Sequence, residues 1–163
     1  MHFFQRILID FLRTKIQRLD KLIYFSDGST AQYKNRYNVL NLYLHKSDFN
    51  VVAEWHFFAT AHAKGPSDGL GGTLKRQARR ATLQLPNNKQ IQTPKDMYEW
   101  AKGNLSGINV GYVSINEMAH HEIQMNRRFK CAIAIKGLRS FHSCIPETDG
   151  NVIFKKIPLL NQN

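Results

Sequence analysis

Several features that define other classes of protein are scarce or absent in this sequence. Among its 163 residues, no apolar run approaches the roughly 20 residues that a helix needs to span a bilayer, and no internal repeat or low-complexity tract occurs. Cysteine occurs only at Cys131 and Cys144, outside any Cys-x-x-Cys pair and at no standard zinc spacing. We therefore expect a soluble protein with no membrane partner, in a nuclear or other intracellular, reducing compartment.

Acidic residues are also scarce. The chain has 23 Lys and Arg against 12 Asp and Glu, a formal net charge of +11. No acid occurs between Asp68 and Asp96. This interval holds six basic residues: Lys75, Arg76, Arg79, Arg80, Lys89 and Lys95. An excess of positive charge favours association with the phosphates of nucleic acids, so we expect nucleic acid, and DNA above all, as the partner.

The hydrophobic residues, 42% of the chain, are arranged as in a folded α/β to α+β protein. Apolar and aromatic runs predict strands, and apolar residues at helical spacing predict helices. Strands are expected over 21–27, 51–60, 108–115 and in the tail, with tail turns at Gly137 and Gly150, and helices over 1–20, 29–45, 73–85, 94–105 and 116–128. We expect two parts, a core over 1–128 and a β-rich segment over 129–163.

The expected N-terminal helix is amphipathic. Its apolar stripe consists of Phe4, Ile7, Leu8, Phe11, Leu12, Ile16 and Leu19. The stripe predicts either the first helix of the core or a surface that binds a protein partner.

Two acids stand at comparable places. Asp27 ends the first expected strand, and Asp68 lies just beyond the second, in a glycine-rich loop that precedes a helix. Ligands bind at the carboxyl ends of strands in open α/β sheets, and paired carboxylates suit Mg²⁺ or Mn²⁺ in phosphoryl transfer. Each acid is also explained as a turn residue, Asp27 in Ser-Asp-Gly and Asp68 in Asp-Gly.

The glycine-rich loop itself predicts an anion site. Gly69, Gly71 and Gly72 would expose backbone N–H groups at the start of a helix. His62 and Lys64 would each add a phosphate contact. The basic helix that follows would hold a nucleic-acid strand.

Two longer segments carry a resemblance. FSDGSTAQYKN at 25–35 and WHFFATAHAKGPSDGLGGTLKR at 55–76 resemble the catalytic core of transposon-derived proteins of the DDE/DDD transposase type, which have an RNase H-like fold. KGLRSFHSCIP at 136–146 resembles the Gly-x-Arg-x-Phe-His element of the same proteins. The residues that match are Asp27, Gln32, Lys34 and Asn35, then His62, Lys64, Gly65, Asp68, Gly69, Gly71, Gly72, Lys75 and Arg76.

The resemblance implies an RNase H-like core that cuts and joins DNA with acid-bound Mg²⁺ or Mn²⁺. Asp27 would be the second acid of the catalytic set and Asp68 a later one. The segment before the Asp27 strand offers no first acid, so we expect a partial core without nuclease activity of its own. Phosphate contacts are expected from Lys34, Lys64, Lys75, Arg76, Arg79 and Arg80, with Asn35 beside them. Two alternatives stay open, a non-catalytic protein-interaction module and an active metal-dependent nuclease.

Overall fold

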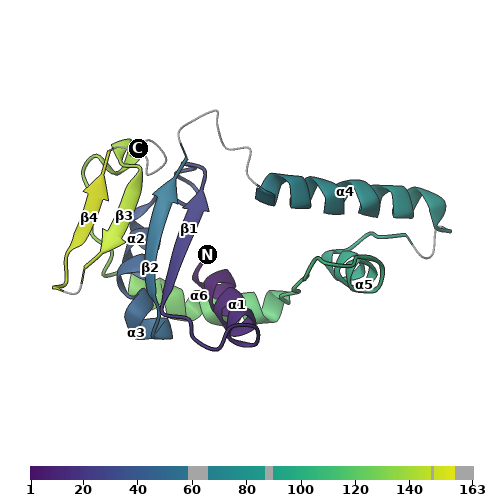
Figure 1. Ribbon diagram of the computed structural model, residues 1–163, viewed down its shortest axis with the longest axis horizontal. Helices are drawn as coiled ribbons and strands as arrows, with labels where there is room; N and C mark the ends of the chain where they lie inside the picture. The colour runs from purple at the N-terminus through teal and green to yellow at the C-terminus, as the bar shows by residue number, and fades with distance from the viewer. Residues whose placement is uncertain (59–65, 87–89, 148, 157–163) are drawn as a thin grey trace. The chain divides into compact units, whose positions relative to one another are not determined.

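The computed structural model describes residues 1–58, 66–86, 90–147 and 149–156. The chain forms two compact units (Figure 1). Unit 1 comprises residues 1–63 and 118–163, and unit 2 comprises residues 64–117. The described residues form six α-helices and one open, mixed four-stranded sheet. The predicted mixture of helices and strands is therefore confirmed.

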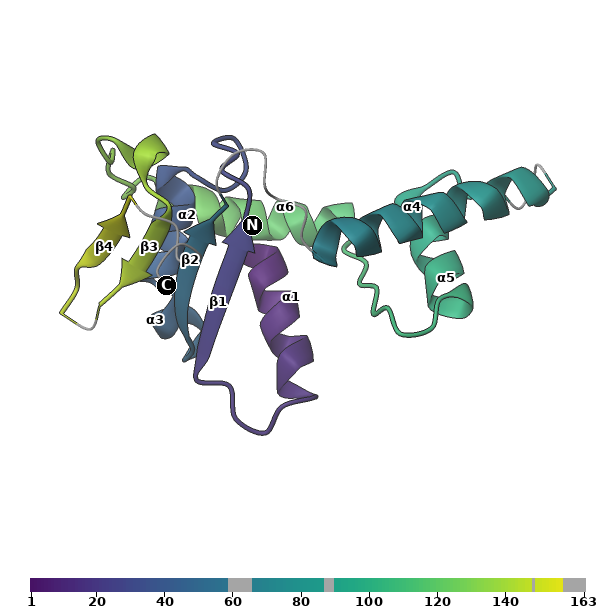
Figure 2. The ribbon, with the colours of Figure 1, turned by 45° about the horizontal axis from the view of Figure 1, so that its top comes forward.

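The sheet belongs to unit 1. Its strands lie in the order β1 (Lys21–Ser26), β2 (Val52–Phe57), β3 (Ser143–Pro146) and β4 (Val152–Lys155). Strands β1 and β2 are parallel, whereas β3 and β4 are antiparallel to their neighbours. Figure 2 shows the strands side by side, with β1 and β4 at the two edges. The two predicted strands are confirmed over residues 21–26 and 52–57, and residues 59 and 60 of the second prediction lie outside the described residues. Residues 108–114 form no strand.

Two helices connect the parallel strands, α2 (Arg36–Tyr43) and α3 (His45–Phe49). The predicted helix start at Ser29 is wrong, because Asn35 caps the helix instead. The Asn35 side chain accepts hydrogen bonds from the amides of Tyr37 and Asn38, at 3.1 and 3.0 Å. Such a cap satisfies amides that have no partner within the first turn.

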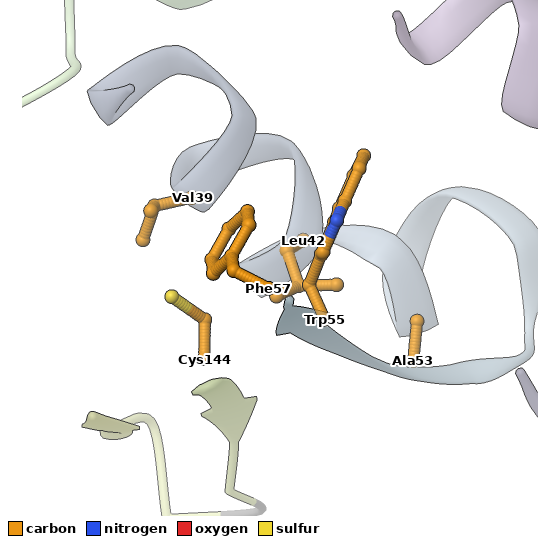
Figure 3. Packing of buried hydrophobic residues seen from close by; sticks show 6 residues of the cluster. All are labelled: Val39, Leu42, Ala53, Trp55, Phe57 and Cys144. Carbon is orange, nitrogen blue, oxygen red and sulfur yellow. The ribbon is translucent and has the colours of Figure 1, made fainter. Parts of the chain in front are cut away.

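The main core lies between α2 and one face of the sheet. Val39 and Leu42 of α2 meet Ala53, Trp55 and Phe57 of β2, and Cys144 of β3 completes the cluster (Figure 3). Alternation along β2 sends these three residues to the same face. The indole N–H of Trp55 donates to Ser26 Oγ at 2.9 Å, which satisfies the one polar atom of that ring.

Helix α1 (His2–Arg13) buries a different face from the one predicted. Ile9 is fully buried against Phe49 and Val51 in a second cluster. Phe4 and Leu8, which belong to the predicted apolar stripe, are 51% and 40% exposed. The prediction that the stripe faces the core is therefore wrong for Phe4 and Leu8.

Unit 2 contains α4 (Pro66–Gln84) and α5 (Pro94–Asn104), which pack on each other. Helix α6 (Ile115–Phe129) begins in unit 2 and continues into unit 1. The predicted start of α5 is confirmed, since Thr93 and Asp96 form a reciprocal capping box with Pro94 in the first turn. Within the described ranges, no helix is long and apolar enough to cross a membrane.

Candidate nucleic-acid interface

Helix α4 carries an exposed cationic face, made of Lys75, Arg76, Arg79 and Arg80. Lys75 and Arg79, and likewise Arg76 and Arg80, are four residues apart, so the four side chains project from one side of the helix. No carboxylate of the described residues lies within ion-pair distance of any of the four. The positive charge of the face is therefore not neutralised within the described part of the chain.

The other side of α4 explains why the cations point outward. Leu74, Ala78 and Ala81 follow a helical spacing of three and four residues, and all three are buried or half-buried. This apolar side is the one available for packing against α5, which α4 contacts. The four cations therefore lie on the exposed side of α4, opposite its buried apolar side.

The prediction of a glycine-rich loop around residues 69–72 is wrong. Gly69, Gly71 and Gly72 lie inside α4, which begins at Pro66 rather than near Thr73. Amides within a helix donate to carbonyls four residues earlier, so these glycines do not form the predicted loop cradle for an anion. A Cβ built on any of the three meets nothing within 4 Å. Gly69 and Gly72 precede Arg76 by seven and four residues, so they leave open surface in line with the cationic face.

The two predicted metal ligands lie in different units. Asp27 is exposed directly after β1, and its carboxylate accepts a hydrogen bond from the Ser29 amide at 3.0 Å. This contact is the turn geometry that the Ser-Asp-Gly sequence also suggested. Asp68 is exposed in the first turn of α4, where the helix dipole favours a negative charge. Their pairing around a metal stays a prediction, and the described residues contain no group of three His, Cys, Asp or Glu side chains suited to a metal ion.

Four further residues were predicted to contact nucleic acid, namely Lys34, Asn35, His62 and Lys64. His62 and Lys64 lie outside the described residues. Asn35 is accounted for by its cap of α2. Lys34 is buried, with 7% of its surface exposed, and its Nζ donates to the carbonyl of Arg139 at 3.1 Å. Burial lowers the pKa of Lys34, because it removes water from the ammonium group.

One network of side-chain hydrogen bonds on the sheet was not predicted from the sequence. His56 Nδ1 lies 3.1 Å from Ser143 Oγ, and its Nε2 lies 3.2 Å from Glu54 Oε2, which also pairs with Lys21 through its other oxygen. Strand alternation places Glu54 and His56 on the same face. The order Ser–His–Glu is that of a hydrolase triad, but Ser143 and His56 are 0% and 2% exposed. A substrate has no access to this serine, so the hydrogen bonds that link Ser143, His56 and Glu54 have a structural role.

A second missed cluster joins three helices of unit 1. His2 of α1 lies 2.9 Å from Nε2 of His121 in α6 and 3.0 Å from the carboxylate of Asp48 in α3. Arg128 of α6 forms a bidentate pair with Asp48 at 2.6 and 2.8 Å. Burial of Asp48 raises its pKa, but the hydrogen bonds from Arg128 and His2 outweigh this effect and lower it. Pairs separated by more than 40 residues leave no local sequence pattern, which is why none was predicted.

The fold and this geometry define an α/β protein with a cationic helix whose four basic side chains have no carboxylate partner among the described residues. By sequence, the chain belongs to the family described as "Domain of unknown function (DUF8701)", whose model matches residues 1–158. Searches of curated proteins and of solved structures gave no match.

Proposed function

We propose that this chain is a nucleic-acid-binding protein, with DNA as its preferred partner, and that the cationic face of α4 is its binding surface. The observation that carries the proposal is the set of four exposed cations without a carboxylate partner among the described residues. A solvated helix face commonly intersperses acids three or four residues from its cations. Here no acid occurs from residue 69 to residue 95.

The chemistry of the face suits phosphate rather than base edges. Arg guanidinium groups bind phosphate oxygens through two parallel N–H donors, and Lys adds a point charge. The pairs Lys75-Arg76 and Arg79-Arg80 lie about one helical turn, roughly 5.4 Å, apart along the axis. The side-chain-free positions Gly69 and Gly72 extend the same face, so a strand can lie close to the helix. Contacts of this kind hold the backbone and are expected to discriminate little between sequences.

Salt dependence gives the first test. Four phosphate contacts on duplex DNA predict a slope of about −3.6 in log K against log salt, so affinity falls about 150-fold between 50 and 200 mM salt. Fluorescence anisotropy with a labelled duplex measures this slope. A variant with all four cations changed to Gln should lose both the binding and the slope.

A matched variant controls for net charge. Changing Lys15, Lys102, Lys130 and Lys156 to Gln removes the same charge from exposed positions outside α4. We expect this variant to retain most of the affinity. Equal losses in the two quadruple variants, or a salt slope near zero in the wild type, would refute a binding surface on α4.

A metal-dependent DNA strand-transfer or nuclease core is the second candidate, as in transposable-element-derived proteins with an RNase H-like fold. It is supported by the parallel pairing of β1 and β2, because Asp27 follows β1 at the carboxyl end, where ligands of such sheets bind. Asp27 and Asp68 would be the ligands of Mg²⁺ or Mn²⁺. Calorimetry with either ion tests it, with Asp27→Ala against the exposed Asp10→Ala. Equal binding by both variants would rule out Asp27 as a ligand.

A protein partner on α1 is compatible with the DNA-binding proposal. The exposure of Phe4 and Leu8 supports it, since large apolar side chains on one helix favour contact with another protein. Changing both to Ser should leave the affinity for DNA unchanged. A loss of DNA binding in this variant would instead place α1 within the nucleic-acid surface.

A further inference from the structure

Unit 1 contains a pocket of about 550 Å³ that α4 does not line. Thr30, Lys34 and Asn35 form one wall, from the turn between β1 and α2. Ile135, Leu138 and Arg139 form the other, from the segment that precedes β3. Pockets of 300–1,000 Å³ are typical of small-molecule sites.

Lys34 is the unusual residue of this pocket. An ammonium group has three N–H donors, and one of them is used by the carbonyl of Arg139. The ring of Phe57 lies 4.8 Å from Nζ and offers a weak cation–π contact. Among the described residues no carboxylate lies within ion-pair distance of Lys34. A buried charge without a counter-ion is costly, so an anion supplied from outside would relieve it.

Two further features favour an anion at the same place. Arg139 lines the pocket, is exposed, and has no ion-pair partner in the described part of the chain. Helix α2 begins at Arg36, next to Lys34 and Asn35 in the wall, so the positive end of its dipole lies there, although Asn35 Oδ1 already accepts from the amides of Tyr37 and Asn38. Ile135 and Leu138 add an apolar wall, which an inorganic ion alone would not contact.

We infer that this pocket binds the phosphate group of a phosphomonoester of about nucleotide size, held between Lys34 and Arg139. Lys34 donates its remaining N–H groups to the phosphate oxygens, and Arg139 closes over them from the exposed side. The hydroxyl of Thr30 is a further donor at the rim. The inference does not depend on the proposed function, because the pocket shares no residue with α4.

Calorimetric titration of the full chain tests the site with inorganic phosphate, adenosine 5′-monophosphate and adenosine. We expect the monophosphate to bind and adenosine not to bind. Lys34→Met and Arg139→Gln should each weaken monophosphate binding at least tenfold, whereas the exposed Lys130→Met should not. Equal binding of adenosine and its monophosphate, or unchanged affinity in both pocket variants, would overturn the inference.

Thermal melting separates a binding role from a structural one. If Lys34 serves mainly to stabilise the fold, Lys34→Met lowers the melting temperature of the ligand-free chain. If Lys34 instead serves to bind an anion, Lys34→Met leaves the melting temperature of the ligand-free chain unchanged or raises it. Should Lys34→Met fail to fold, Arg139→Gln decides the binding question, since its backbone carbonyl is kept.

A third experiment resolves the source of the phosphate. A short oligonucleotide with a 5′-phosphate is compared with the same strand lacking it, both in the background of the α4 Gln variant. A preference for the phosphorylated strand that Arg139→Gln abolishes assigns the pocket to a nucleic-acid end. Binding of the mononucleotide without such a preference assigns it to a free nucleotide.

Discussion

The cluster of His2, Asp48, His121 and Arg128 predicts that the chain loses stability in mild acid. Burial and the neighbouring positive charges lower the pKa of His121 from 6.5 to about 4. Burial also lowers the pKa of His2, although Asp48 opposes the shift. The folded state therefore keeps both rings neutral at a pH where the unfolded chain is protonated. Stability is complete above about pH 6.5 and falls as the pH decreases toward 4.

The size of the effect follows from His121. Each pKa unit corresponds to about 1.4 kcal/mol, so the full shift would be worth about 3.4 kcal/mol. His121 is only half-buried, and solvent screens part of its interactions, which leaves about 1–2 kcal/mol. A second loss begins below the ordinary Asp pKa of 3.8, because the pKa of Asp48 is lowered in the folded chain, so its carboxylate stays charged there while the same group in the unfolded chain is protonated.

Urea unfolding at pH 7.5, 6, 5 and 4 measures this loss directly. His121→Gln should reduce the pH dependence of the unfolding free energy between pH 6.5 and 4. His120→Gln is the matched control, since His120 is exposed and adjacent in the sequence. If both variants show the wild-type pH dependence, or if the wild type is equally stable at pH 7 and pH 4.5, the reasoning is wrong.

Three substitutions test the fold by thermal or urea unfolding. Asn35→Ala removes the cap of α2 and should cost about 1 kcal/mol, whereas Gln32→Ala, at an exposed turn position, should cost little. Leu42→Ala opens a cavity in the main core and should cost about 2–5 kcal/mol, while Leu83→Ala, at 76% exposure, should stay within about 0.5 kcal/mol. Gly71→Ala should stabilise unit 2 by about 0.5–1 kcal/mol, because a methyl group meets nothing within 4 Å there; destabilisation would contradict a helix at this position.

Local chemistry explains which elements were predictable. Strands β1 and β2 are rich in β-branched and aromatic residues, and both were predicted from that composition. The structure adds that they pair in parallel. Thr93, Pro94 and Asp96 form a cap whose signals lie within four residues. The start of α2 was predicted at Ser29, whereas Asn35, a residue type that also favours helix caps, caps the helix in the structure.

Other features depend on distant partners. Residues 108–114 have the composition of a strand, but they join no ladder in the structure. The three glycines of α4 favoured the prediction of a loop, yet the helix continues through them. Of the candidate sites, the cationic face follows from charge and helical spacing alone. The pocket does not, since its Lys34 and Arg139 are separated by 105 positions.

Unit 2 is inserted between β2 and β3, which pair directly through Trp55 and Cys144. All four strands of the sheet are therefore present only after the inserted residues have been synthesised. Folding of unit 1 must wait for its C-terminal strands, β3 and β4. Loop-closure entropy grows slowly with length, by about 0.6 kcal/mol per doubling. Insertions or deletions within unit 2 are therefore expected to cost the sheet of unit 1 little free energy.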